Sequence, residues 1–164
     1  MRAAALQTLR DSGAAVLVVT HDAEEAMMMA DALALMKHGR ILQTGTPRDC
    51  YLNPTSPEAA RLLGDTVELA AELKAGQAAT AFGAVPAQGS GPARLVARPE
   101  AFRIAEQGVE ATVGEVRFTG PFVLADIETS GQRAVARVPH ALAPQTGEVV
   151  RIRLEPVFCA VFPA

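Results

Sequence analysis

The sequence is most informative at Val18-Val19-Thr20-His21-Asp22-Ala23-Glu24-Glu25-Ala26. This stretch ends an apolar, β-branched run over residues 14–20, which is typical of a strand buried on both faces of a parallel sheet. Asp22 stands at a helix N-cap position and Glu25 follows three residues later, so the two form a capping box for a helix over residues 23–31. The pattern places His21 at the carboxyl edge of a sheet, where open α/β folds bind ligands. From this histidine alone, a cap of the local backbone is the simpler interpretation.

Further short elements are predicted on both sides of this stretch. They are a helix over residues 2–11, a hairpin with strands 33–36 and 41–43, and helices that open at Thr46-Pro47 and Ser56-Pro57. Each of the last two pairs combines a capping hydroxyl with a proline at the first helical position. Gly64 is expected to end the second of these helices. We therefore expect a first domain over residues 1–64.

The chain after Gly64 reads as short strands separated by Gly and Pro, which is typical of a small sandwich or barrel. Eight strands are predicted, at 67–73, 78–82, 94–98, 110–118, 122–128, 133–138, 148–154 and 157–162. Residues 86–92 are expected to form a flexible surface loop, because Gly89-Ser90-Gly91 lies within them. We expect an all-β second domain over residues 65–164.

The composition excludes several classes of protein. The chain has 164 residues, 49% hydrophobic and 20% charged, with a formal net charge of -3, so it is globular and a poor candidate for a nucleic-acid-binding protein. The longest strictly apolar run, residues 14–19, is far shorter than the ~20 residues of a membrane helix. Cys50 and Cys159 lie far apart without a CxxC pair, which favours a reducing, cytoplasmic compartment.

The stretch around His21 resembles the H-switch of ABC-transporter nucleotide-binding subunits. The resemblance continues through Ala30-Asp31, Leu35-Met36, Gly39-Arg40-Ile41, Gln43, Gly45-Thr46-Pro47, Tyr51 and Pro54. It implies that His21 contacts the γ-phosphate of ATP and reports its presence, with Asp22 as its structural neighbour. A neutral histidine can donate a hydrogen bond to a phosphate oxygen, which suits this role.

Other motifs of the family are missing from the sequence. It contains no GxxxxGK[ST] phosphate loop, no LSGGQ-type signature, and no apolar strand that ends in Asp-Glu. We therefore expect the C-terminal piece of a longer subunit, whose parent would be an ABC-type transport ATPase that uses ATP and Mg²⁺. Phosphoryl transfer depends on positioning and on stabilising charge. The fragment itself is predicted to hold no cofactor and to be inactive alone, and the sequence leaves its status as an enzyme open.

The second domain resembles the TOBE domains of importer ATPases. The resemblance lies in Leu95-Val96-Ala97-Arg98-Pro99-Glu100, in residues 110–120 and in residues 147–152. The predicted fold class is accordingly α+β, with an incomplete α/β remnant of an ABC ATPase domain followed by an all-β, OB-like barrel. Arg98 and Glu100 are candidate ligand-binding residues. An ion pair between them at a barrel corner is the favoured alternative.

Residues 64–87 and 116–121 resemble ferric-iron importer ATPases and their phosphonate and polyamine relatives most. The resemblance implies that the parent couples ATP hydrolysis to solute uptake, ferric iron in the first instance. It implies as partners a second copy of the chain and integral-membrane permease subunits, which would hold the protein on the inner face of the plasma membrane. A sensor of small oxyanions and a purely dimerising module for a phosphonate or polyamine importer are the alternatives.

Several residues invite a site prediction for which the sequence gives little support. His21, His38 and His140 are scattered and predict no metal site. Met27-Met28-Met29 is expected to place one or two side chains in the core rather than to bind a soft metal. Arg133, Arg137, Arg151 and Arg153 could hold an oxyanion, although a solvated polar face is the favoured interpretation. The phenylalanines lie in apolar strands and are expected in the core.

Overall fold

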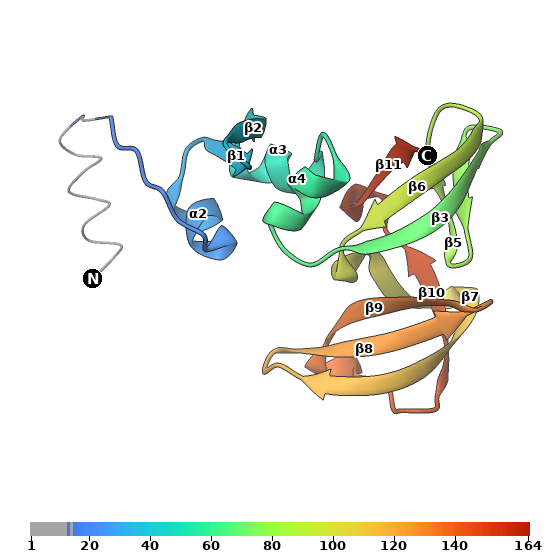
Figure 1. Cartoon of the computed structure of the whole chain (residues 1–164). Helices are drawn as coiled ribbons and strands as arrows, with labels where there is room; N and C mark the ends of the chain where they lie inside the picture. The colour runs from blue at the N-terminus through green and yellow to red at the C-terminus, as the bar shows by residue number, and fades with distance from the viewer. Residues whose placement is uncertain (1–12, 14) are drawn as a thin grey trace.

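The computed structural model describes residue 13 and residues 15–164 (Figure 1). The first part of the described chain holds three short helices and a hairpin. These elements are α2 (Ala23–Met29), β1 (Leu33–Lys37), β2 (Arg40–Gly45), α3 (Pro47–Leu52) and α4 (Pro57–Leu62). They enclose a small core of their own, built on Leu33, Leu35, Cys50, Ala59 and Leu63. The helix predicted over residues 2–11 lies outside the described residues.

The helices of this part begin where the capping residues predict. Asp22 Oδ1 accepts a hydrogen bond from the Glu25 amide at 2.9 Å and so caps α2. Thr46 and Ser56 cap α3 and α4 in the same way, and a proline follows each of them. Each cap satisfies an amide that the first helical turn leaves without a partner. The predicted start of each helix is confirmed, although α2 ends at Met29 rather than at residue 31.

The predicted hairpin is also confirmed, as β1 pairs antiparallel with β2. His38 and Gly39 form its turn with φ angles of 50° and 74°. Positive φ at both central positions is the requirement of the two-residue turn that matches strand twist. Met27 packs against the small core while Met28 is 73% exposed, as the core interpretation of the methionines expects.

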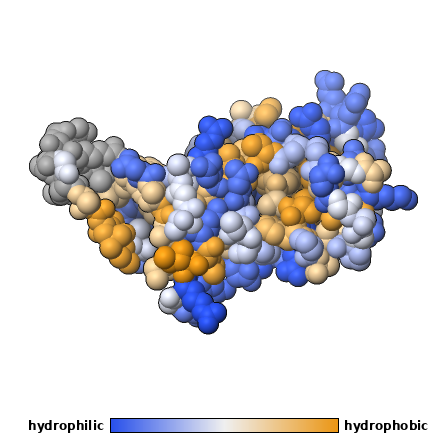
Figure 2. Space-filling model, turned by 90° about the horizontal axis from the view of Figure 1, so that it is seen from above, coloured by the Kyte–Doolittle hydropathy of each residue, from blue (hydrophilic) through white to orange (hydrophobic). Residues whose placement is uncertain are grey.

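The strand predicted over residues 14–20 is wrong for the described part of the run. Residues 15–20 carry no secondary structure, and Leu17 and Val19 are each 90% exposed. Figure 2 shows apolar side chains at the surface at this end of the molecule. A strand is held by ladder hydrogen bonds and by packing of its faces, and within the described chain no strand pairs with residues 15–20.

The second part consists of two antiparallel sheets. The five-stranded sheet has the order β11-β6-β3-β4-β5, with β3 (Val67–Lys74), β4 (Gln77–Thr80), β5 (Gly83–Pro86), β6 (Gly91–Ala97) and β11 (Cys159–Pro163). The four-stranded sheet has the order β10-β7-β8-β9, with β7 (Phe102–Phe118), β8 (Phe122–Thr129), β9 (Gln132–Pro139) and β10 (Val149–Leu154). Three short 3₁₀ turns connect them, η1 (Pro99–Ala101), η2 (His140–Leu142) and η3 (Pro156–Phe158).

One apolar core joins the two sheets. Alternate residues of β3 and of β8 are buried, and both sets belong to the same cluster. This alternation is the pattern of a sheet with one face in the core. At the centre, the Phe82 and Phe102 rings meet edge to face with centroids 5.3 Å apart. The chain is therefore mainly β, and its second part has the expected OB-like fold.

The structure corrects several strand predictions. β5 was not predicted, and β6 begins at Gly91, inside the predicted flexible loop. β7 begins at Phe102, eight residues before the predicted strand, because it pairs with β10 in two sections. Arg151 pairs with Glu110 whereas Ile152 pairs with Ile104, so residues 105–109 are an insertion in the ladder. Such bulges leave no alternation for a sequence pattern to detect.

Replacement of Gly108 in this bulge is predicted to destabilise the fold. A Cβ atom there would lie 2.2 Å from the Ile152 carbonyl oxygen and 2.7 Å from its carbon. Both neighbours are backbone atoms of a paired strand, so Gly108→Ala should lower the free energy of unfolding by about 2 to 3 kcal/mol. Urea unfolding measures this. The control is Gly131→Ala, where φ is also positive but nothing lies within 4 Å, and its cost should be about 1 kcal/mol. Equal losses for the two variants would contradict the prediction.

Candidate functional site

His21 lies on an exposed bend immediately before α2. The bend is held by side chains on either side of the histidine. The Asp22 amide donates to Thr20 Oγ1 at 3.1 Å, and Thr20 Oγ1 donates to Glu25 Oε2 at 3.0 Å. Asp22, and not His21, caps the helix, and none of the described residues hydrogen bonds to the imidazole. His21 is thus presented to solvent on a braced turn rather than used as a local cap.

Arg98 lies where the two parts of the chain meet, since it precedes η1 of the barrel and hydrogen bonds to α4. It is 3% exposed and is the only buried charged residue in the described part of the chain. Its Nη1 donates to the Ala60 carbonyl oxygen at 2.8 Å and more weakly to the Gly64 and Asp65 carbonyl oxygens at 3.2 and 3.4 Å. The guanidinium therefore binds the backbone with which α4 ends. The Ala60 carbonyl oxygen accepts from both Arg98 and the Leu63 amide, and the end of a helix carries partial negative charge.

Tyr51 on α3 completes this junction. The Arg98 guanidinium stacks over its ring, with Cζ 4.2 Å from the centroid, and Nη2 donates to the Tyr51 carbonyl oxygen at 3.4 Å. The Tyr51 hydroxyl donates to Glu100 Oε1 in η1. The second oxygen, Glu100 Oε2, is buried and has no hydrogen-bond partner among the described residues. We call these three side chains, Arg98, Tyr51 and Glu100, the junction triad.

The junction triad shifts the ionisation of its own members. Burial raises the pKa of Tyr51 to about 12, and the hydrogen bond and negative charge of Glu100 act in the same direction. Burial lowers the pKa of the Arg98 guanidinium, while Tyr51 and Glu100 oppose this effect. Arginine has so high a pKa that it stays charged regardless. The triad therefore holds a buried cation beside a phenol that keeps its proton.

The structure brings Arg98 and Glu100 together differently from the sequence prediction. The ion pair expected between them is not formed, since both side chains meet through Tyr51. The space beside Arg98 measures about 10 Å³, which is room for at most one water molecule. The sequence analysis named Tyr51 only as part of the family resemblance and did not predict a role for it. Its partners lie 47 and 49 residues away, so no local pattern indicates the contacts.

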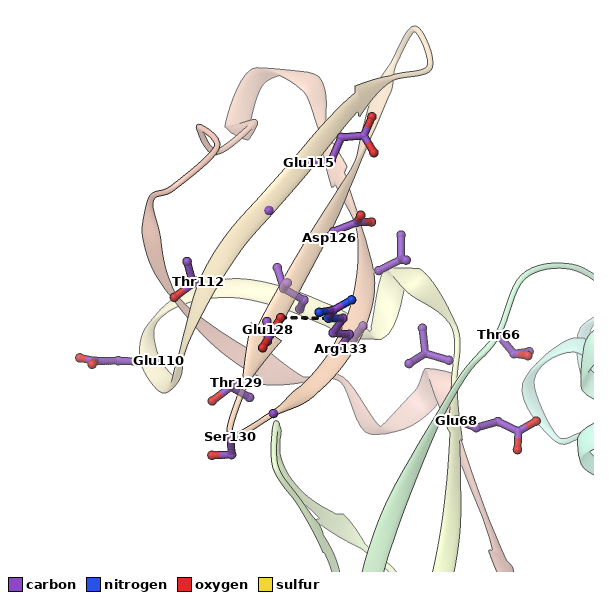
Figure 3. Close-up of a pocket in the computed structure, with 16 residues that line it drawn as sticks. Thr66, Glu68, Glu110, Thr112, Glu115, Asp126, Glu128, Thr129, Ser130 and Arg133 are labelled. Atoms are coloured by element: carbon purple, nitrogen blue, oxygen red, sulfur yellow. Dashed lines mark hydrogen bonds and ion pairs between the residues drawn. The ribbon is translucent and has the colours of Figure 1, made fainter.

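A separate groove of about 1020 Å³ lies between the start of β3 and strands β7 to β9 (Figure 3). Its acidic side chains are Glu68, Glu110, Glu115, Asp126 and Glu128, and each has an arginine partner. Figure 3 shows one such pair inside the groove, between Arg133 and Glu128. Exposed pairs of this kind contribute little energy. The groove is polar, and its carboxylates are already paired with arginines.

Within residues 15–164 no three His, Cys, Asp or Glu side chains gather as a metal site. Arg151 and Arg153 are exposed and pair with Glu110 and Glu155, which fits the solvated polar face. No helix in the described part of the chain combines the length and the apolar character that crossing a membrane requires.

Comparison with known proteins places this geometry in context. Residues 95–162 match the model of the TOBE domain. The chain is 39% identical over 127 residues to "Fe(3+) ions import ATP-binding protein FbpC" of Serratia marcescens, with 73% of this chain and 36% of that protein covered. It is 33% identical over 156 residues to the protein of the same name from Pseudomonas fluorescens, with 93% and 43% covered. The chain thus spans about two fifths of the length of these curated relatives.

A solved structure is similar at a lower level. The cytoplasmic molybdate-binding protein ModG aligns with a TM-score of 0.45 at 9% identity, covering 61% of this chain and 96% of that one. So low a score gives no argument about this chain. The match to the TOBE model and to the iron-import proteins agrees with the family that the sequence resembles, in both its parts.

Tyr51 provides a direct test of the junction triad, because it is the only tyrosine of the chain. The ultraviolet absorbance of its phenolate should rise near pH 12 in the folded chain and near pH 10 in denaturant. A folded pKa above the unfolded value stabilises the fold below pH ~10, and this contribution is lost as the pH rises from ~10 through ~12. Tyr51→Phe should lack that loss. A folded chain that titrates near pH 10 would refute the buried hydrogen bond to Glu100.

Replacement of Arg98 should destabilise the junction strongly. Arg98→Met removes the buried donor to the Ala60 and Gly64 carbonyl oxygens and the cation that stacks on Tyr51. A hydrogen bond from a charged group contributes about 1.5 to 3 kcal/mol. We expect a loss of about 3 kcal/mol in urea unfolding. The control is Arg94→Met, which removes an exposed cation 3.5 Å from Glu68 and should cost less than about 1 kcal/mol. Similar losses for both variants would show that Arg98 does not stabilise the junction more than an exposed arginine does.

Proposed function

We propose that this chain, in which a TOBE domain follows the closing elements of an ABC-type ATP-binding subunit, works as the C-terminal portion of an ABC importer ATP-binding subunit. In this proposal residues 1–64 are the remnant of the α/β ATPase domain, and residues 65–164 are the regulatory TOBE domain. The observation that carries it is a similarity to iron-import ATP-binding proteins that extends over 93% of the chain and through both parts.

His21 is the residue to which we assign the γ-phosphate contact. Its exposure on a braced turn before α2 supports this role, because the imidazole is free to meet a ligand while its backbone is fixed. A neutral imidazole would donate one hydrogen bond to a phosphate oxygen. Asp22 acts indirectly, since its carboxylate caps α2 and thereby sets the position of the turn.

The residues of this chain do not fit Mg²⁺-ATP by themselves. The sequence has no phosphate loop to supply backbone amides and a lysine. No cluster of metal-ligating side chains occurs in residues 15–164. Tight nucleotide binding and hydrolysis therefore belong, in this proposal, to a complete subunit to which this chain contributes His21. The geometry of the described residues gives no support to a hydrolytic step.

The junction triad is proposed to couple the two parts. Arg98 holds the end of α4 and the ring of Tyr51, and α3 in turn packs against the small core to which α2 belongs. A displacement at His21 would be transmitted through this core to the barrel, since the buried contacts of the triad join the barrel to α3 and α4. We assign the barrel a regulatory role on this basis.

The partners and solute of the proposed subunit follow from the relatives. We propose ferric iron as the solute, membrane permease subunits as partners, and a position on the inner face of the plasma membrane. A second copy of the chain is a further proposed partner. The exposed apolar side chains of Leu17, Val19, Met28 and Ile41 support association with another protein surface.

A chimaera tests the proposed function. In it, the matching C-terminal part of the Serratia marcescens iron-import ATP-binding protein is replaced by this chain, and ATP hydrolysis is measured. The chimaera should be active, and His21→Ala should reduce turnover about 10²-fold, the usual cost of losing one transition-state hydrogen bond. His38→Asn on the exposed hairpin turn is the matched control and should leave turnover unchanged. The isolated chain should show no turnover.

Two outcomes would contradict the proposal. A folded chimaera without activity would show that the chain cannot replace the corresponding part of the relative. An active chimaera that tolerates His21→Ala would refute the assigned role of the histidine while leaving the rest of the assignment intact.

A further inference from the structure

Several apolar side chains are exposed to solvent at the β7–β8 turn of the barrel. Phe118 and Leu142 are each 69% exposed and Phe122 is 41% exposed. The sequence prediction placed all phenylalanines in the core, and for Phe118 and Phe122 it is wrong. Both are paired in the ladder but stand at the last residue of β7 and the first of β8, and Phe122 alternates with the buried Val123. We call Phe118, Phe122, His140 and Leu142 the tip patch.

The tip patch is held rigid by its own contacts. The Thr119 amide and hydroxyl both donate to the Phe122 carbonyl oxygen, at 3.0 and 2.9 Å. The His140 amide donates to the Pro121 carbonyl oxygen at 3.0 Å, which fastens η2 to the turn. The rings of Phe118 and His140 meet edge to face at 5.1 Å. Exposed aromatic side chains that are already ordered lose little entropy on binding, as the anchor residues of interfaces do.

The two segments that supply the tip patch carry arginines but no carboxylates. Residues 116–125 and 134–147, which supply the turn and η2, contain no Asp or Glu, although the whole chain has 18. Arg117 is already paired with Asp126 and Glu115. Arg137 is half-buried beside Phe122, with Cζ 5.9 Å from the ring centroid. It makes no ion pair within the described part of the chain, and its charge also acts to lower the pKa of Tyr51. A rigid apolar patch beside a guanidinium that makes no ion pair is complementary to a carboxylate flanked by apolar side chains.

We propose that the tip patch is a docking surface for an acidic, apolar segment of a partner protein. Phe118, Phe122 and Leu142 bind its apolar side chains and Arg137 binds its carboxylate. A second copy that contacted the patch with its own patch would bring two unpaired Arg137 side chains together, which opposes association. An anionic membrane surface is recognised by clusters of several basic residues, and only Arg137 beside the tip patch makes no ion pair among the described residues of these segments. The inference does not depend on the importer assignment.

Two short synthetic peptides probe this surface on the full chain. In one, Glu alternates with Leu and Phe, and in the other Lys replaces every Glu. With the isotope-labelled chain, the acidic peptide should shift the amide resonances of the β7–β8 turn and of η2. The basic peptide should not shift them. Phe118→Ser combined with Phe122→Ser should weaken binding at least about tenfold, and Arg137→Gln should weaken it and reduce its dependence on salt.

Matched variants separate binding from folding. Ile41→Ser removes an exposed apolar side chain from the separate hairpin, and Arg133→Gln removes an arginine that pairs with Glu128. Both should bind the acidic peptide as the unaltered chain does. Absence of binding, equal binding of both peptides, or shifts confined to another face would overturn the proposal. So would shifts that grow with protein concentration without peptide, or patch-dependent binding to phosphatidylglycerol vesicles in place of the acidic peptide, since these identify a second copy or a lipid surface as the occupant.

Discussion

The junction between the helical part and the barrel depends on one buried cation. A guanidinium that is 3% exposed is costly to remove from water unless its donors are satisfied. Arg98 meets that condition without a carboxylate, because the backbone that closes α4 offers carbonyl oxygens and Tyr51 offers the face of its ring. The satisfaction is geometric, so α3, α4 and η1 must all hold their places at once. This explains how two parts with separate cores form one structure.

The same constraint explains the state of Glu100. Its carboxylate accepts from the Tyr51 hydroxyl with one oxygen and buries the other without a partner. A direct bond to Arg98 would relieve it, but the guanidinium is already committed to α4. The junction thus satisfies its cation at the expense of its anion. An arrangement of this kind is sensitive to small displacements of α3, because among the described residues only Tyr51 contacts both side chains.

The sequence predicted the elements that local chemistry determines. The capping residues Asp22, Thr46 and Ser56 and the turn at His38-Gly39 act within a few residues, and the structure confirms them. The run over residues 14–20 was predicted as a strand from its composition, yet a strand exists only with a neighbour to pair with. The bulge of β7 and the role of Tyr51 depend on contacts across 40 or more residues, and no periodicity reveals such contacts. Elements that are set by contacts within a few residues were predicted. Features that depend on residues far away in the sequence were not.

The error at Phe118 and Phe122 has another origin. Both residues lie in strands, as predicted, but their side chains are exposed rather than in the core. Phe118 and Phe122 belong to apolar strands, but they stand at the strand ends beside the turn, and Phe122 lies out of phase with the buried residues of β8. The fold nevertheless orders this exposed surface, with two hydrogen bonds to one carbonyl and a third that fastens η2. Order at an exposed apolar surface has no evident benefit for the core, whose residues lie elsewhere. A surface that is rigid, apolar and free of carboxylates is better explained by recognition than by stability.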